Sequence, residues 1–140
     1  MKALIRTSGN PTEAVIRILK EMLAQGLVEA WLLPISVAGN GVSPALVREE
    51  AILDRARPFA PVMSINLARA LSTVAKRGGA GKIGALLRPC EQRAFVELVK
   101  FHQIDPGSVL VVGMDCPGTY ELKDYASAAD NGTLEETVLR

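Results

Sequence analysis

The stretch from residue 82 to residue 114 constrains the fold of this chain more than any other part of its sequence. Residues 82–87 are predicted to form a strand, residues 91–103 a helix with one apolar face, and residues 108–114 a buried strand. Two strands separated by a helix of about a dozen residues are typical of a parallel β–α–β unit, because parallel strands need a crossover of that length. Such crossovers are right-handed in nearly all folds. The stretch therefore predicts a parallel sheet covered by helices.

The rest of the chain continues the alternation of strands and helices. The apolar periodicity and the turn residues predict strands at 3–7 and 30–37, and helices at 11–26, 43–57 and 65–76. Pro34 favours an edge or irregular position for its strand. We expect an α/β fold with a largely parallel sheet and helices on both faces, formed as a single domain by residues 1–125. Residues 126–140 are expected to be a polar tail or the start of a missing carboxy-terminal region.

Composition narrows the possible partners and compartment. Sixteen Lys and Arg residues against fifteen Asp and Glu residues give a net charge of +1, which argues against nucleic acid or an anionic membrane surface as a partner. No apolar run reaches the roughly 18 residues that a membrane span requires, and the first residues do not resemble a signal peptide. Two cysteines do not make a secreted disulfide framework. We therefore expect a cytoplasmic protein without a membrane span.

Two cysteines follow predicted strands of the parallel sheet. Cys90 comes shortly after the strand at 82–87, and Cys116 shortly after the strand at 108–114. Since parallel strands end at one edge of a sheet and neighbours lie about 4.8 Å apart, both side chains could reach one small ligand. The helix dipole and the adjacent Arg88 favour the thiolate form of Cys90, which ligates iron or zinc or attacks a disulfide. The alternative is that both cysteines are small buried hydrophobic residues.

Other polar residues are expected at the same edge of the sheet. Ser8 and Gly9 lie in a predicted strand-to-helix turn whose backbone N–H groups could face a phosphate. The turn has neither a GxGxxG nor a P-loop pattern, and ordinary helix capping by Ser8 or Asn10 explains it equally well. Asp115 could accept a proton beside Cys116, or it could cap the turn that follows.

The segments around the two cysteines resemble a known family. Residues 84–94 read GALLRPCEQRA and residues 112–119 read VGMDCPGT. Together they resemble the beta-subunit family of the factor 420 (deazaflavin coenzyme) hydrogenases and dehydrogenases, which includes formate dehydrogenase beta subunits. The likeness extends to residues 56–61 (ARPFAP) and more faintly to residues 7–9. Many members have Gly-Thr-Pro-Cys in place of the Leu-Arg-Pro-Cys that ends at Cys90.

The resemblance implies an electron-transfer function. Members of the family are flavoproteins that carry FAD and a 4Fe–4S cluster, and they pass electrons between the cluster, the flavin and a hydride-accepting substrate. By this resemblance Cys90 and Cys116 are cluster ligands, and Arg88 is a nearby positive charge that stabilises the reduced cluster. The implied cofactor-binding residues are Ser8, Gly9, Arg88 and Asp115. The implied partners are other redox subunits of a hydrogenase or dehydrogenase complex and a small-molecule electron carrier.

The chain also departs from the family pattern. The family takes two more cluster cysteines from a downstream CxxC motif, which is absent from these 140 residues. Two thiolates do not complete a cluster that needs four. We expect the chain to be the amino-terminal portion of a longer polypeptide, and inactive on its own without the cluster; completion by another chain or loss of the cluster are the alternatives. Other hypotheses are a cofactor-free docking module for a redox partner subunit and a thiol–disulfide enzyme that uses Cys90 and Cys116.

Overall fold

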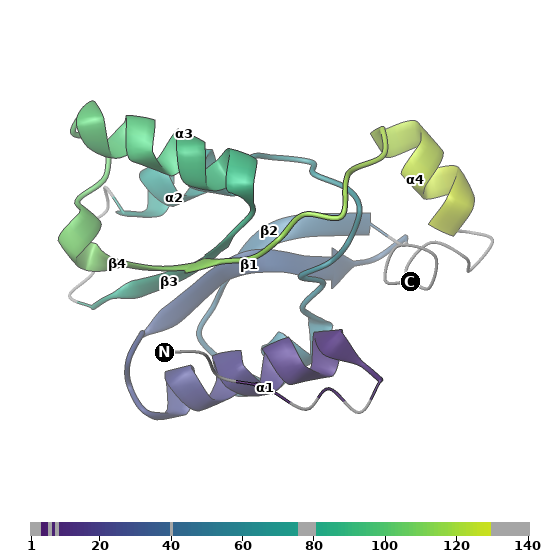
Figure 1. Cartoon of the computed structure of the whole chain (residues 1–140), viewed down its shortest axis with the longest axis horizontal. Helices are drawn as coiled ribbons and strands as arrows, with labels where there is room; N and C mark the ends of the chain where they lie inside the picture. Colours follow the sequence, from purple (N-terminus) through teal and green to yellow (C-terminus); the bar gives the residue numbers. More distant parts are fainter. Residues whose placement is uncertain (1–3, 6, 8, 40, 76–80, 130–140) are drawn as a thin grey trace.

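A four-stranded sheet with helices on both faces forms the centre of the computed structural model (Figure 1). The structure describes residues 4–5, 7, 9–39, 41–75 and 81–129. The strand order is β2-β1-β3-β4, for β1 (Ala30–Val37), β2 (Gly41–Val47), β3 (Ile83–Leu87) and β4 (Val109–Gly113). β3 is parallel to both β1 and β4, while β2 is antiparallel to β1. The protein is therefore an α/β protein with a mostly parallel sheet, as predicted.

The predicted β–α–β unit is confirmed. β3 and β4 pair in parallel from Ile83 opposite Val109 to Leu87 opposite Gly113. The crossover helix α3 (Pro89–Lys100) is followed by the short 3₁₀ helix η2 (Pro106–Ser108). Proline suits the start of both helices, because its ring fixes φ and its missing N–H has no partner in a first turn. This unit positions the residues that follow β3 and β4.

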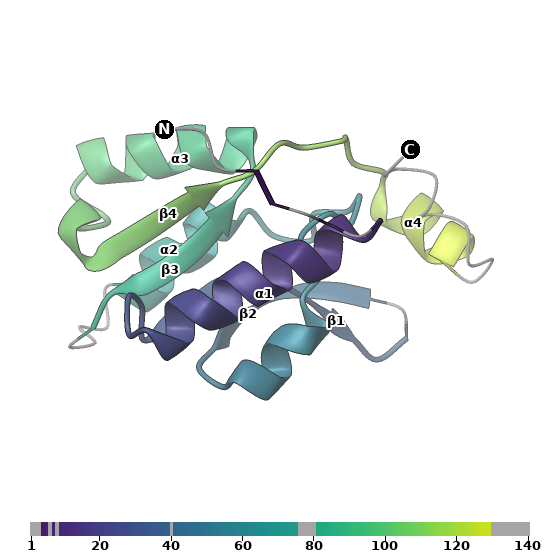
Figure 2. The same ribbon diagram turned by 60° about the horizontal axis from the view of Figure 1, so that its bottom comes forward.

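The helices divide between the two faces of the sheet. α2 (Leu67–Ala75) and α3 cover one face, while α1 (Pro11–Ala24) and the 3₁₀ helix η1 (Glu50–Arg55) cover the other. Figure 2 shows α1 lying lengthwise along the sheet on its own face. α1 begins at the edge of the sheet where β1, β3 and β4 end (Figure 1). The helices predicted at 11–26 and 65–76 are therefore present with slightly shorter bounds.

The core has one layer on each face of the sheet because side chains alternate along the strands. On the α1 face Trp31 and Leu33 of β1 pack with Leu86 of β3, while Leu32 packs on the α2 face. The Trp31 ring is fully buried, and its Nε1–H donates to the carbonyl of Leu19 at 2.9 Å. Gly84 lies against this ring: a Cβ atom there would lie 2.5 Å from ring carbons of Trp31. Close packing of the indole thus requires glycine at this position.

The strand predicted at 30–37 is confirmed, and Pro34 occupies the part of it that β3 does not reach. β1 pairs with β3 only from Ala30 to Leu32. On its other side β1 pairs with β2 from Trp31 to Val37, and Pro34 lies opposite Pro44. The carbonyl of Pro34 accepts a hydrogen bond from the backbone N–H of Arg57 at 2.9 Å, so an irregular segment replaces β3 along this half of the strand.

The helix predicted at 43–57 is wrong. Residues Gly41–Val47 form β2, which completes a hairpin with β1, and only Glu50–Arg55 is helical, as the 3₁₀ helix η1. Ser43-Pro44 fits a helix cap and first turn, but a proline is also tolerated in a strand at the edge of a sheet, which is the place of β2. Gly39, with a φ of +74°, provides the left-handed backbone of the turn. Pairing with β1 therefore outweighs the local helix signals.

The strand predicted at 3–7 is not formed by the residues that can be described there. Leu4, Ile5 and Thr7 belong to no strand, and Leu4 is fully exposed; Ala3 and Arg6 lie outside the described residues. A short apolar run is too little to define a strand without a partner, since strand preference depends on the neighbouring strands.

The chain beyond β4 is anchored to residues 60–62. The backbone N–H of Tyr120 donates to the carbonyl of Pro61 at 2.8 Å. A final helix, α4 (Leu122–Ala129), buries Tyr125 against Ala60 and Val62. The expected boundary between residues 125 and 126 falls inside this helix, and residues 130–140 lie outside the described part.

Candidate functional site

The two cysteines lie at the same edge of the sheet and after adjacent strands. Leu87 and Gly113 are the last paired residues of β3 and β4, and each cysteine follows three residues later. The backbone N–H of Met114 donates to the carbonyl of Leu87 at 3.1 Å, which extends this contact by one residue. Cys90 is exposed and Cys116 is half-buried, and both are free thiols. Neither is part of the hydrophobic core, so both are open to a ligand or a reagent.

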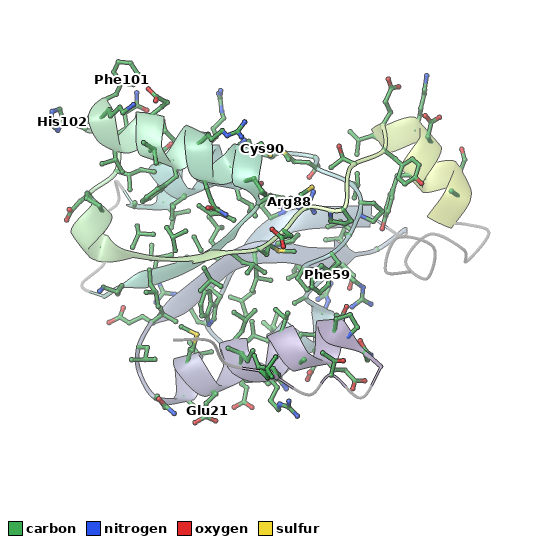
Figure 3. The ribbon with its side chains drawn as sticks, in the orientation of Figure 1. Glu21, Phe59, Arg88, Cys90, Phe101 and His102 are labelled. Carbon is green, nitrogen blue, oxygen red and sulfur yellow. The ribbon has the colours of Figure 1, made fainter. Side chains whose placement is uncertain are left out.

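Local sequence explains why Cys90 is exposed. Arg88 has an extended backbone and Pro89 begins α3, which places Cys90 in the first turn of the helix. Figure 3 shows Cys90 and Arg88 together at this end of α3. The first-turn N–H groups of a helix lack partners within the helix, so its positive end faces the Cys90 region. The positive end of the α3 dipole therefore lies at the turn that carries Cys90.

Sequence reasoning missed Glu91, which is only 1% exposed. Its Oε2 accepts a hydrogen bond from the backbone N–H of Arg88, and its Oε1 accepts one from the backbone N–H of Leu67, both at 2.9 Å. One carboxylate thus joins the starts of α3 and α2. An acidic residue at the third position of a helix often accepts a hydrogen bond from the backbone N–H of the residue just before the helix. This pattern could have indicated the bond from Arg88. The second bond depends on the tertiary fold.

Arg88 is buried rather than exposed beside the cysteines. It is 4% exposed, and its Nη2 donates to the carbonyl of Ala60 at 2.6 Å. Its Nη1 is buried and has no hydrogen-bond partner. Arg88 lines a cavity of about 20 Å³ together with Pro34 of β1 and Pro44 of β2. The cavity therefore lies toward β1 and β2, whereas Cys116 follows β4 on the other side of β3.

The remaining predicted site residues are less informative. Asp115 is exposed, directly before Cys116. Gly9 is exposed with a φ of +86°, and Ser8 lies outside the described residues. The side chain of Asn10 accepts a hydrogen bond from the backbone N–H of Glu13 at 3.3 Å, so ordinary capping accounts for the start of α1. No contact of these residues distinguishes a phosphate site from a capped helix.

Cys90 and Cys116 are the thiols of this edge that could ligate a metal. Within the described ranges no group of three or more His, Cys, Asp or Glu side chains is close enough to hold a metal ion. The whole sequence contains two cysteines, whereas a 4Fe–4S cluster needs four ligands. The chain could thus supply half of the thiolates of such a cluster.

A larger cavity lies at the opposite edge of the sheet. It measures about 420 Å³ and is lined mainly by apolar residues at the starts of β1 and β3, the end of β2 and the end of α2, including Ala30, Ile83, Leu46 and Val74. Glu29 and Arg48 are its charged residues. Since parallel strands bind ligands at their carboxyl ends, this cavity is not at the expected place for a catalytic site.

Comparison with models of protein families does not assign the chain to a family. A scan of the sequence against models of known protein families finds no match. None of the helices in the described part of the chain is long and apolar enough to cross a membrane. The functional assignment therefore rests on the cysteines, their surroundings and the motifs around them.

Proposed function

We propose that this chain is the amino-terminal α/β domain of an iron–sulfur flavoprotein oxidoreductase of the factor 420 hydrogenase and dehydrogenase beta-subunit type. One observation supports it above the others: Cys90 and Cys116 occupy equivalent places after the adjacent parallel strands β3 and β4. These are the two cysteines of the motifs that resemble the family. Equivalent positions at one edge are what two ligands of a shared centre require.

In this proposal the two thiolates would hold one side of a 4Fe–4S cluster, which supplies one-electron transfer when bound. The remaining two ligands would come from outside these 140 residues. Cys90 lies in the first turn of α3, whose N–H groups form the positive end of the helix dipole, and this suits the negative charge of a bound cluster. The exposure of Cys90 leaves room for the partner that completes the site.

The FAD of the proposed enzyme has weaker support in the described residues. Ser8 and Gly9 remain candidates by the family resemblance, but the side chain of Asn10 already caps α1. The proposal therefore assigns no flavin contact from the structure. The proposal also includes other redox subunits and a small-molecule electron carrier as partners, and a cytoplasmic location.

Iron analysis of the protein and its natural complex tests the proposal. The tagged chain is purified without oxygen from its native cells as wild type, Cys90→Ser, Cys116→Ser and Val96→Ser, the last an exposed position on α3 that serves as the control. We expect iron and acid-labile sulfide to copurify with the wild type and the control, and to be lost with either cysteine variant.

Two outcomes would contradict this assignment. Iron that stays unchanged in Cys90→Ser and Cys116→Ser would exclude these residues as ligands. A wild-type complex without iron, whose partner subunits are retained equally by all four proteins, would instead support the cofactor-free docking module.

A further inference from the structure

The Arg88 guanidinium is a buried positive charge with little compensation. The side chain is 4% exposed, and among the described residues its hydrogen bond runs from Nη2 to a neutral carbonyl, that of Ala60. A guanidinium has five N–H donors, and Nη1 has no partner for its share of them. Burying a charge is costly unless it is paired and hydrogen-bonded. The residue therefore lacks the acceptor that would make its burial favourable.

No carboxylate of the described chain fills this role. Arg88 takes part in none of the ion pairs formed between described residues. Glu91 is the acidic residue of the cavity lining, but its two oxygen atoms accept hydrogen bonds from the backbone N–H groups of Leu67 and Arg88. Its negative charge is thus offset by the positive ends of α2 and α3 and does not neutralise the guanidinium.

The cavity beside Arg88 has room for one acceptor atom. Its volume of about 20 Å³ is enough for one water-sized group. Arg88 and Glu91 are its charged lining residues, and most of the others are apolar. Ser64 and Ile65 also line it and are exposed, so the cavity opens to the surface beside the start of α2. A larger ligand could therefore insert one atom and keep the rest of its body outside.

We propose that Arg88 anchors an oxyanion-binding site, in which one oxygen of a phosphate or carboxylate group enters the cavity and accepts a hydrogen bond from Nη1. An anion supplies both a hydrogen bond and a compensating charge, whereas a water molecule supplies only the hydrogen bond. This site is separate from the proposed cluster ligands and does not depend on them.

Thermal unfolding of the 140-residue protein tests the site. Sodium chloride is replaced stepwise by sodium phosphate, or in a second arm by sodium acetate, at constant ionic strength and pH. A phosphate concentration ten times its dissociation constant raises the ratio of folded to unfolded protein about 11-fold, which corresponds to a rise in Tm of about 4–6 °C. We expect a saturating rise in at least one arm. A rise with phosphate alone assigns the site to phosphate compounds, and a rise with acetate alone to carboxylates.

Three variants identify the residue responsible. Arg88→Met removes the charge but keeps the length of the side chain and should abolish the rise in Tm. Arg88→Lys keeps the charge without the forked donors and should show a reduced rise. Arg93→Met, an exposed arginine on α3, is the matched control and should respond as the wild type does.

A spectroscopic measurement covers the case in which Arg88→Met does not fold. The Nε–Hε NMR resonance of Arg88, assigned by its loss in Arg88→Lys, should shift with phosphate or acetate along the same saturation curve as the Tm. The proposal is overturned if neither anion shifts the wild-type Tm or this resonance. It is equally overturned if Arg88→Met responds as strongly as the wild type, since the effect then arises elsewhere.

Discussion

Replacing Glu91 by alanine should destabilise the fold severely, because one buried carboxylate serves the starts of two helices. The substitution leaves the backbone N–H groups of Leu67 and Arg88 without their acceptor in a dry environment. Hydrogen bonds to a charged group contribute about 1.5–3 kcal/mol each, so the loss of two predicts a fall of about 3–6 kcal/mol in the free energy of unfolding. This is a large part of the roughly 5–15 kcal/mol that stabilises a typical domain.

Urea denaturation followed by the fluorescence of Trp31, the single tryptophan, measures this loss. Glu91→Gln keeps one acceptor oxygen and should lose about 1.5–3 kcal/mol, which gives a second value if the alanine variant does not fold. Glu97→Ala on the same helix removes only an exposed ion pair with Lys100 and should change stability by less than about 1 kcal/mol. A loss for Glu91→Ala no larger than that for Glu97→Ala would refute the reasoning.

Two further substitutions and one chemical reaction test the contacts and exposures described above. Gly84→Ala places a methyl group 2.5 Å from the Trp31 ring and should lower the free energy of unfolding by about 1–3 kcal/mol, measured by the same urea titration; an unchanged midpoint would show that the ring can move aside. Asn10→Ala removes the side-chain cap of α1 and should lower the thermal stability by about 1 kcal/mol, and an equal Tm would contradict it. Cys90 should react with a thiol reagent faster than the half-buried Cys116, measured by mass spectrometry after digestion, and the reverse order would be incompatible with their exposure.

Local sequence patterns predict the elements whose residues have a clear apolar periodicity. The β3–α3–β4 unit was predicted because two apolar strands and an amphipathic helix follow one another within the chain. The helix predicted at 43–57 failed because Ser43-Pro44 fits both a helix start and an edge strand, and only pairing with β1 decides between them. The run at 3–7 failed for a related reason: apolar residues make a strand only where a neighbouring strand accepts them.

The candidate site likewise contains residues whose positions could be predicted from the sequence and residues whose positions could not. Cys90 and Cys116 could be placed together from strand order alone, since parallel strands end at one edge. The burial of Arg88 and Glu91 could not, because their partners Ala60 and Leu67 are 28 and 24 residues away in sequence. The capping pattern at the start of α3 indicates the bond between Glu91 and the N–H of Arg88, but nothing local indicates that Glu91 also reaches Leu67 or that the Arg88 side chain turns inward to Ala60.

The short segment 60–62 contacts both Arg88, which follows β3, and the part of the chain that follows β4. The carbonyl of Ala60 accepts a hydrogen bond from the Arg88 guanidinium, and the carbonyl of Pro61 accepts one from the N–H of Tyr120. Tyr125 packs against Ala60 and Val62. Residues 60–62 therefore contact both the buried cation and the stretch that follows Cys116, which links the two places directly. Coupling between two binding sites is reciprocal. If a group bound at the sulfur atoms changes the affinity for the anion by some factor, the anion changes the affinity for that group by the same factor.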